Sequence, residues 1–279
     1  MGIILGIDIG GSTTKICGFD RERRLIAPLS VKADDPVSSI YGAFGKFTSK
    51  HAISLSEIEC VMITGVGSTH IDENLYGIPT VHVAEFDCVG LGGQYLAGLN
   101  ETVVVSMGTG TALVHVKDKK IRYLGGTGVG GGTLVGLSET ILGIRDIDHL
   151  EELALKGDIS KVDLRISDIS NKELGPTLDL DTTAANFGKL SDLATREDLA
   201  LGIMNLVFET IGMVSVFAAS GFGIDTVVLT GKLCALHRCK AVFDVLGKMF
   251  NMKFLVPENA RYGTVIGAAL LYFHKQENP

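Results

Sequence analysis

The sequence has too few basic residues to balance its acidic ones. Its 279 residues include 25 lysines and arginines against 32 aspartates and glutamates, a formal net charge of −7. Such a chain offers no strongly basic surface for a polyanion, so we expect no nucleic-acid partner. Any anionic ligand must then be held by local hydrogen-bond donors and a metal ion rather than by the overall field of the protein.

Signals for export or membrane insertion are also missing. Residues 1–8 carry no basic region and run directly into an apolar strand, which is not the pattern of a signal peptide. The most apolar later stretch, residues 201–222, is interrupted by Asn205 and Glu209, which favours a buried or interface helix over a membrane span. We therefore expect a cytoplasmic protein with no membrane partner.

The five cysteines do not form a disulfide framework. They are odd in number and scattered along the chain, which is typical of reduced thiols in a cytosolic protein. Cys234 and Cys239 are too far apart for a CxxC pair, although His237 lies between them. Ordinary packing is favoured over a zinc site at this place.

Glycine, in contrast, is abundant. The chain has 35 glycines, and two glycine-rich loops, residues 8–15 and 106–111, each follow a short apolar run typical of a β-strand. Glycines allow backbone N–H groups to approach phosphate oxygens, and a carboxylate at a strand end, Asp8, suits a hydrated Mg²⁺ ion. Either loop alone could be only a tight hairpin. Two matching loops favour a single polyphosphate, ATP, held between two lobes.

The order of the expected elements also repeats along the chain. Strands expected at 3–8 and 15–19 recur at 102–106 and 112–117, and the length and the 46% hydrophobic content suffice for two cores. We expect an α/β protein with domains 1–99 and 100–279. The other expected elements are helices at 36–51, 87–99 and 198–220, and strands at 60–64 and 77–83.

Four further segments carry a family resemblance. Together with the two loops, residues 83–87, 125–133, 181–188 and 258–268 resemble the type II pantothenate kinases. These enzymes belong to the actin-like, sugar-kinase and Hsp70 ATPase superfamily, in which two ribonuclease-H-like domains close on ATP. The resemblance implies ATP-dependent phosphorylation of pantothenate to 4'-phosphopantothenate in coenzyme A biosynthesis, with ATP and Mg²⁺ as cofactors.

Two acidic residues compete for the role of catalytic base. Glu85 follows an apolar strand and precedes a helix rich in small residues, and Asp87 lies two residues later. From the residues alone, either carboxylate could simply stabilise the N-terminus of the helix. The resemblance implies that Glu85 accepts the proton of the substrate hydroxyl.

The resemblance also assigns nucleotide-binding residues to both lobes. Asp8 would hold Mg²⁺, the glycines at 130–132 would precede the N-terminus of a helix and form an anion site, and Lys15 could instead be a solvated surface residue. The full set expected to bind the nucleotide is Asp8, Ile9, Gly10, Gly11, Ser12, Thr13, Thr14, Lys15, Gly108, Thr109, Gly110, Gly130, Gly131, Gly132, Thr133, Leu134, Val135, Gly231 and Lys232.

The expected substrate residues include one departure from the family. Type II pantothenate kinases usually have an arginine where this chain has Tyr123, and Arg122 next to it would face the other side of a strand unless a bulge re-aims it. The acceptor is therefore pantothenate, a related pantoyl compound or another hydroxylated small molecule. The substrate residues expected are Thr109, Arg122, Tyr123, Ala184 and Ala185.

The long apolar helix expected at 198–220 suggests a homodimer, because a helix that is apolar nearly all round must be covered. Packing within its own domain is the alternative. In the dimer, we expect the loop around Ala184 and Ala185 near the active cleft. Two other functions also stay open: an ATPase that activates a radical dehydratase, which requires cysteines for a shared iron–sulfur cluster, and a non-catalytic nucleotide-binding regulator.

Overall fold

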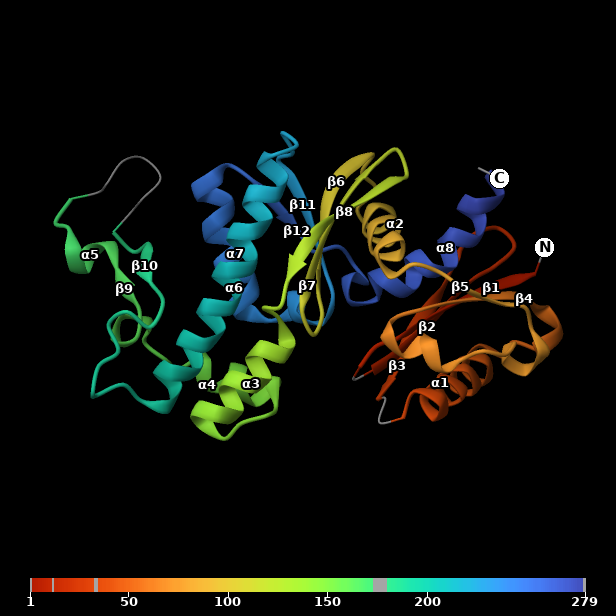
Figure 1. Cartoon of the computed structure of the whole chain (residues 1–279), viewed down its shortest axis with the longest axis horizontal. Coiled ribbons are helices and arrows are strands. Elements are labelled where there is room, and N and C mark those ends of the chain that lie inside the picture. Colours follow the sequence, from red (N-terminus) through yellow and green to blue (C-terminus); the bar gives the residue numbers. More distant parts are fainter. Residues whose placement is uncertain (1, 12, 33–34, 173–179, 278–279) are drawn as a thin grey trace.

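The computed structural model describes residues 2–11, 13–32, 35–172 and 180–277, so the nucleotide-binding role expected for Ser12 lies outside the described residues. Two lobes lie side by side along the long axis of the molecule, and a smaller arm extends from the lobe that holds the middle of the chain (Figure 1). Each lobe is organised around one mixed β-sheet.

The first sheet has the strand order β3-β2-β1-β4-β5. Its strands are β1 (Ile3–Ile9), β2 (Thr13–Phe19), β3 (Leu25–Lys32), β4 (Ile58–Thr64) and β5 (Thr80–His82). β1 pairs antiparallel with β2 and parallel with β4. Helix α1 (Pro36–His51) covers one face, where Ile40, Phe44 and Phe47 enter the core. The α1 helix begins after Asp35, whose carboxylate accepts the Ser38 N–H.

The second sheet repeats this arrangement in the order β12-β11-β6-β7-β8. Its strands are β6 (Glu101–Met107), β7 (Thr111–Lys117), β8 (Lys120–Thr127), β11 (Thr226–Thr230) and β12 (Lys253–Leu255). As in the first sheet, the opening strand pairs antiparallel with the second and parallel with the fourth. The predicted repeat of the hairpin start is therefore confirmed, and both glycine-rich loops occupy the same place, the turn of the opening hairpin.

Two helices cross between the lobes, and each packs on the sheet formed mainly by the other part of the chain. Helix α2 (Glu85–Ala97) comes from the first half of the chain but packs on β6, β7 and β8, whereas α8 (Gly263–Glu277) comes from the end of the chain and packs on β1, β2 and β4. The boundary that we predict at residue 99 lies between the strands of the two sheets, while α2, which precedes it, packs on the second sheet and α8, which follows it, packs on the first. Buried residues of α8, such as Ile266, share a core with Ile4 and Phe19.

Glycines allow α2 and α8 to cross at backbone contact. A methyl group at Gly267 would overlap the carbonyl oxygen of Cys88, and one at Gly92 would overlap that of Gly263. We expect Gly267→Ala to lower the free energy of unfolding by about 1–3 kcal/mol or more. Gly42→Ala is the control, because a methyl group there meets nothing within 4 Å and should gain about 0.5–1 kcal/mol of helix propensity. Chemical denaturation of both variants measures the difference, and equal stability would contradict the close crossing.

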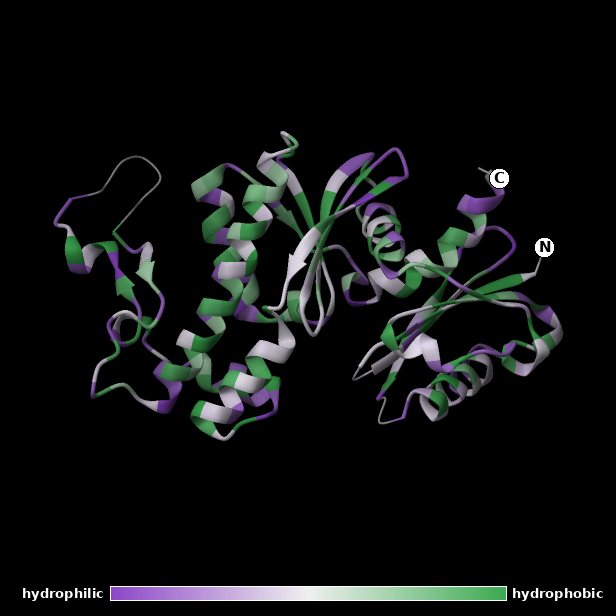
Figure 2. Ribbon diagram, viewed as in Figure 1, coloured by the Kyte–Doolittle hydropathy of each residue, from purple (hydrophilic) through white to green (hydrophobic). Residues whose placement is uncertain are grey.

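The remaining helices belong to the second lobe and the arm. They are α3 (Gly131–Leu142), α4 (Ile147–Ala154), α5 (Ile166–Ile169), α6 (Arg196–Ser220) and α7 (His237–Phe250), and β9 (Leu164–Arg165) pairs with β10 (Thr183–Ala185) in the arm. By length and hydropathy α6 could cross a membrane, but 67% of its most apolar window is buried inside the protein. Figure 2 shows that apolar residues predominate along α6, whereas the turn between β7 and β8, on the other side of the second sheet, is hydrophilic.

Several expected elements differ by one to three residues in their bounds, and two of these differences bear on the site. The strand expected at 77–83 is only Thr80–His82, because residues Leu75–Gly77 form a turn in which Tyr76 has a positive φ. The helix expected at 87–99 begins two residues earlier, at Glu85. This shift places Glu85 inside the first helical turn together with Asp87.

Candidate active site

Asp8 lies near the end of β1, just before the first glycine-rich turn. It is 6% exposed and stands on β1 between Lys15 of β2 and Thr64 of β4. Lys15 Nζ is 3.1 Å from Asp8 Oδ2, so Lys15 is not a solvated surface residue. Gly65, with φ of 88°, follows β4, and a Cβ there would lie 2.7 Å from Asp8 Oδ1. Only glycine lets the chain pass this close to the carboxylate while adopting that backbone conformation.

Side chains alternate between the two faces of a strand, so the other residues of this turn do not all point the same way. Gly10 donates its N–H to Thr13 O at 3.1 Å and closes the turn. Ile9 is fully buried in the first core, and the Thr14 hydroxyl is 2.8 Å from the Ser39 hydroxyl of α1. The side chains of Ile9 and Thr14 therefore face α1, and only their backbones could contact a nucleotide.

Glu85 begins α2 directly after β5. The Thr64 hydroxyl donates to Val83 O at 3.0 Å, and Val83 N donates to Ile63 O at 2.9 Å, which fixes the approach to the helix at the end of β4. Glu85 is exposed to solvent. Partial desolvation by the protein around it raises the pKa of Glu85, the charge of Asp8 raises that pKa further, and Lys15 opposes the shift. Glu85 thus lies within electrostatic reach of Asp8 and Lys15.

This part of the site is strongly acidic. Burial raises the pKa of the Cys88 thiol to about 12, and the negative charges of Asp8, Asp87 and Glu85 contribute to the shift. Carboxylate oxygens are the ligands that Mg²⁺ prefers, and one or two carboxylates together with substrate phosphates suffice to hold it. Asp8, with Glu85 nearby, fits such an ion, although the described residues contain no group of three side chains that could bind a metal alone.

The second glycine-rich loop is bonded to the glycine segment before α3. Gly131 N donates to Gly108 O at 2.9 Å, and Gly132 N donates to Thr109 O at 2.8 Å. A Cβ at Gly130 would lie 2.6 Å from Thr109 O. The predicted anion site at this helix N-terminus therefore loses the N–H groups of Gly131 and Gly132, which the neighbouring loop already uses. These glycines are needed for close contact between two backbones.

The rest of the predicted nucleotide segment is partly buried. Leu134 is fully buried in the second core, Val135 is half-buried, and Thr133 Oγ1 accepts the Gly130 N–H at 3.1 Å. Gly110 closes the hairpin, its carbonyl oxygen accepting the Gly108 N–H at 2.9 Å.

The segment around Gly231 lies against the end of β6, beside the second glycine-rich loop and the start of α3. Gly231 follows β11 with φ of 94°, and a side chain there would overlap the carbonyl oxygen of Met107 at the end of β6. Leu233, two residues on, would lie 3.7 Å from a Cβ at Gly131. Lys232 is exposed, and its charge reaches Asp146 at the start of α4. The structure thus brings together the segments around Gly108, Gly131 and Gly231.

The two substrate residues expected on β8 face opposite ways. Tyr123 lies opposite Val114 and Arg122 opposite His115. Val114 packs toward α2 with Val89, whereas Arg122 lies over the Phe222 ring, 5.8 Å from its centroid. The ladder shifts between Leu113 and Val114, after Tyr123 along β8, so that the bulge does not re-aim Arg122. Arg122 is therefore not part of the group around Glu85.

Ala184 and Ala185 lie in the arm, on the far side of α6 from α2 (Figure 1). Within one chain the structure does not bring them together with Glu85. Both are exposed, and polar groups that sequence reasoning missed hold the segment on α6. Asn186 Nδ2 donates to Glu209 Oε2 at 2.9 Å, and the Phe187 N–H donates to Asp163 Oδ1 at 2.8 Å. The role of the buried Asp163 could not be predicted from the sequence, because its hydrogen-bond partners are distant from it in the chain and produce no local sequence pattern.

All five cysteines are buried. Cys17 donates its thiol to Val265 O at 3.4 Å, linking β2 to α8, and Cys234 donates to Gly231 O at 2.9 Å. Burial raises the pKa of the thiols of Cys17, Cys234 and Cys239. These thiols act as core side chains, and His237 is exposed rather than turned toward them.

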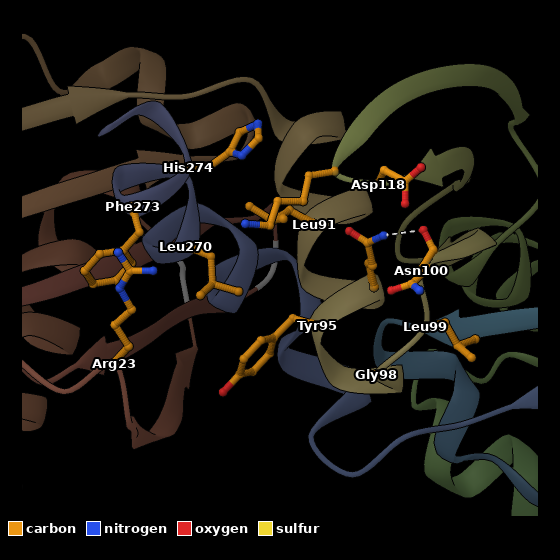
Figure 3. A pocket seen from close by; sticks show the side chains of 12 residues that line it. Arg23, Leu91, Tyr95, Gly98, Leu99, Asn100, Asp118, Leu270, Phe273 and His274 are labelled. Carbon is orange, nitrogen blue, oxygen red and sulfur yellow. Dashed lines mark hydrogen bonds between the residues drawn. The ribbon is translucent and has the colours of Figure 1, made fainter. Parts of the chain in front are cut away.

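A pocket of about 680 Å³ lies at the other end of α2, away from all of these residues. It is lined by α2, α8 and the two hairpin turns that contain Arg23 and Asp118 (Figure 3). Gln94 Nε2 donates to Asn100 O at 2.8 Å on one wall. Because Glu85 begins α2 and this pocket adjoins the last turn of that helix, it is separate from the candidate active site.

The chain is similar in sequence and in fold to known proteins. A family model described as Fumble matches residues 98–251. A type II pantothenate kinase of Bacillus cereus is 28% identical over 286 residues, which cover 95% of this chain and 97% of that protein. Component A of (R)-2-hydroxyglutaryl-CoA dehydratase from Acidaminococcus fermentans has a similar structure, with a TM-score of 0.70 at 19% identity over 100% of both chains. A ROK family glucokinase from Streptomyces griseus in complex with glucose and AMPPNP gives 0.63 at 15% identity over 97% of this chain and 99% of that one. The expected two-lobed α/β fold is confirmed.

Proposed function

The chain belongs to the Fumble family, and on that premise we propose that it is an ATP-dependent kinase that phosphorylates pantothenate. The full-length relative named as a type II pantothenate kinase supports this activity. The observation that carries the proposal is the placement of Glu85, with its raised pKa, within electrostatic reach of Asp8 and Lys15 at the end of the first glycine-rich turn.

Phosphoryl transfer to a hydroxyl needs aligned phosphates, neutralised charge and an acceptor for the hydroxyl proton. Glu85 accepts that proton, because a carboxylate with a raised pKa is a stronger base than an ordinary glutamate. Asp8 would hold Mg²⁺ at the terminal phosphates, and Lys15 would contribute its positive charge to them from the first lobe. When bound, Mg²⁺ supplies charge neutralisation at the phosphate oxygens. The loops around Gly108 and Gly231 form the nucleotide side of the second lobe.

We also propose a homodimer formed along α6. Phe217 is 67% exposed, and Leu206, Met213 and Val214 are half-buried along the same helix. Apolar side chains that stay wholly or partly accessible along one helix are typical of an interface. Ala184 and Ala185 lie beyond α6 and far from Glu85 in one chain, so in the dimer these residues would approach the site of the partner subunit.

Phe217→Glu tests the dimer. A charge placed in an apolar interface is costly, so we expect the variant to elute as a monomer while the wild type elutes as a dimer in light-scattering chromatography. Leu55→Glu is the matched control, because Leu55 is an exposed apolar residue of the first lobe, 47% exposed, and should leave the dimer intact. A wild type that is monomeric at all concentrations would contradict the interface.

The kinase function is tested by ADP release with ATP, Mg²⁺ and a panel of hydroxylated acceptors headed by pantothenate, with glucose as a sugar control. We expect release that depends on pantothenate. ADP release with no dependence on any acceptor would favour an ATPase, and no release at all would favour a nucleotide-binding regulator. The likeness to the dehydratase component concerns the fold alone, and the five buried cysteines do not form an exposed group that two chains could share.

A further inference from the structure

Two exposed aromatic rings are stacked beside the proposed base. Phe86 follows Glu85 in the first turn of α2, and its ring lies parallel to that of Tyr123 on β8, with centroids 3.9 Å apart and planes 8° apart. The two residues are 38% and 47% exposed. Rings buried only to tie a helix to a strand would hide their outer faces, whereas these remain accessible to a ligand.

The pair is positioned by the close packing of α2 on the second sheet. Gly90 lies one helical turn after Phe86, and a Cβ at Gly90 would be 2.9 Å from Ile121. Ile121 and Tyr123 are two residues apart and so face the same side of β8. The contact of Gly90 with Ile121 therefore holds α2 against β8, and Phe86 meets Tyr123 one helical turn earlier along α2.

One ring of the pair belongs to the helical turn that carries Glu85, and the other belongs to the strand that leads to the glycine segment at residues 128–132. At one end Phe86 adjoins Glu85 in the chain. At the other end the Tyr123 hydroxyl lies 3.3 Å from the position that a Cβ at Gly126 would take, next to the glycine segment before α3. A molecule whose hydroxyl is presented to Glu85 therefore meets the rings with another part of its length.

The charges around the pair disfavour a second anion. Glu85, Asp87 and Asp8 contribute negative charge at the start of α2, Lys15 is paired with Asp8, and Arg122 points to the opposite face of β8. Tyr123 can donate one hydrogen bond but carries no charge. A carboxylate resting on the rings would face acidic neighbours.

We propose that Phe86 and Tyr123 determine acceptor specificity and select a pantoyl compound whose end remote from the reacting hydroxyl is an uncharged amide rather than a free carboxylate. This inference rests on the proposed kinase function. It distinguishes two acceptors of one chemical class, pantothenate itself and a neutral N-alkyl amide of pantothenate, which share the reacting hydroxyl and differ at the other end.

The experiment compares kcat/KM of the wild type for these two acceptors, with ATP and Mg²⁺ saturating. We expect the neutral amide to be preferred by about tenfold, the ratio that roughly one unfavourable charge contact produces. Tyr123→Arg should reverse the preference, mainly through KM, because its guanidinium can bind the carboxylate. Tyr123→Phe is the matched control and should keep the ratio, since it retains the ring and its neutrality.

Phe86→Leu separates specificity from a structural role. If the rings bind the acceptor, this variant raises KM for the amide more than for pantothenate, whereas a purely structural pair would lower both activities equally. Equal use of the two acceptors by the wild type, or a preference for pantothenate, overturns the inference while leaving the kinase function in place. If the wild type phosphorylates neither compound, the proposed function fails and the inference fails with it.

Discussion

Glu85→Gln should lower kcat by roughly 10²–10⁴-fold, the usual contribution of a general base. Glutamine keeps the size of the side chain and its hydrogen bonding but cannot accept the proton of the acceptor hydroxyl. Binding of ATP should barely change, because Glu85 is assigned to the acceptor and not to the nucleotide. Steady-state kinetics and a nucleotide-binding titration measure the two effects separately.

Asp87→Asn is the control for this prediction, because Asp87 stands in the same helical turn. We expect a much milder effect, typical of a carboxylate that stabilises a helix N-terminus. If Asp87→Asn loses most of its kcat while Glu85→Gln remains active, then Asp87 and not Glu85 is the general base.

The pH profile gives an independent readout of the base. Because desolvation and Asp8 raise the pKa of Glu85, the protonated and inactive form should persist to higher pH than for an ordinary glutamate. The wild-type kcat should therefore fall as the pH drops through this raised pKa, and the fall should disappear in Glu85→Gln. A profile that is the same in both proteins would remove Glu85 from the proton transfer.

Asp8→Asn should reduce Mg²⁺-dependent turnover by more than about a hundredfold, because a metal ion contributes several kcal/mol of charge stabilisation at the transferred phosphate. The amide removes the charge that would hold the metal and leaves Lys15 without its anionic partner. Activity measured as a function of Mg²⁺ concentration, together with a thermal unfolding curve, separates loss of metal from loss of fold.

Asp244→Asn is the matched control, since Asp244 is an exposed carboxylate on α7 and its variant should behave as the wild type. Normal activity of Asp8→Asn at every Mg²⁺ concentration would remove Asp8 from the site.

The sequence predicted those features that local patterns determine. The alternation of apolar residues and the glycine-rich turns were enough to predict the repeated hairpins, with Asp8 and Gly10 at the turn. The packing of α2 on the second sheet and of α8 on the first could not be predicted. It depends on close contact between Gly92 and Gly267, which are far apart in the sequence, and hydrophobic periodicity indicates only local structure. The glycines at the start of α3 suggested an anion-binding site, but in the structure the Gly131 N–H donates its hydrogen bond to Gly108 O.

The candidate site was predictable to a similar extent. The family resemblance pointed to Glu85, and the structure adds two causes that raise its pKa, first its partial desolvation and then the nearby charge of Asp8. The stacking of Phe86 on Tyr123 joins α2 to a strand of the second sheet. It could be seen only once the packing of Gly90 on Ile121 was known.

The most direct test of the central claim is to identify the product when wild-type protein is incubated with ATP, Mg²⁺ and pantothenate or its neutral N-alkyl amide. Mass spectrometry should show an acceptor that has gained one phosphoryl group, in an amount equal to the ADP formed, and Glu85→Gln should form far less of it. ADP accompanied by free phosphate, with both acceptors unchanged, would contradict the account.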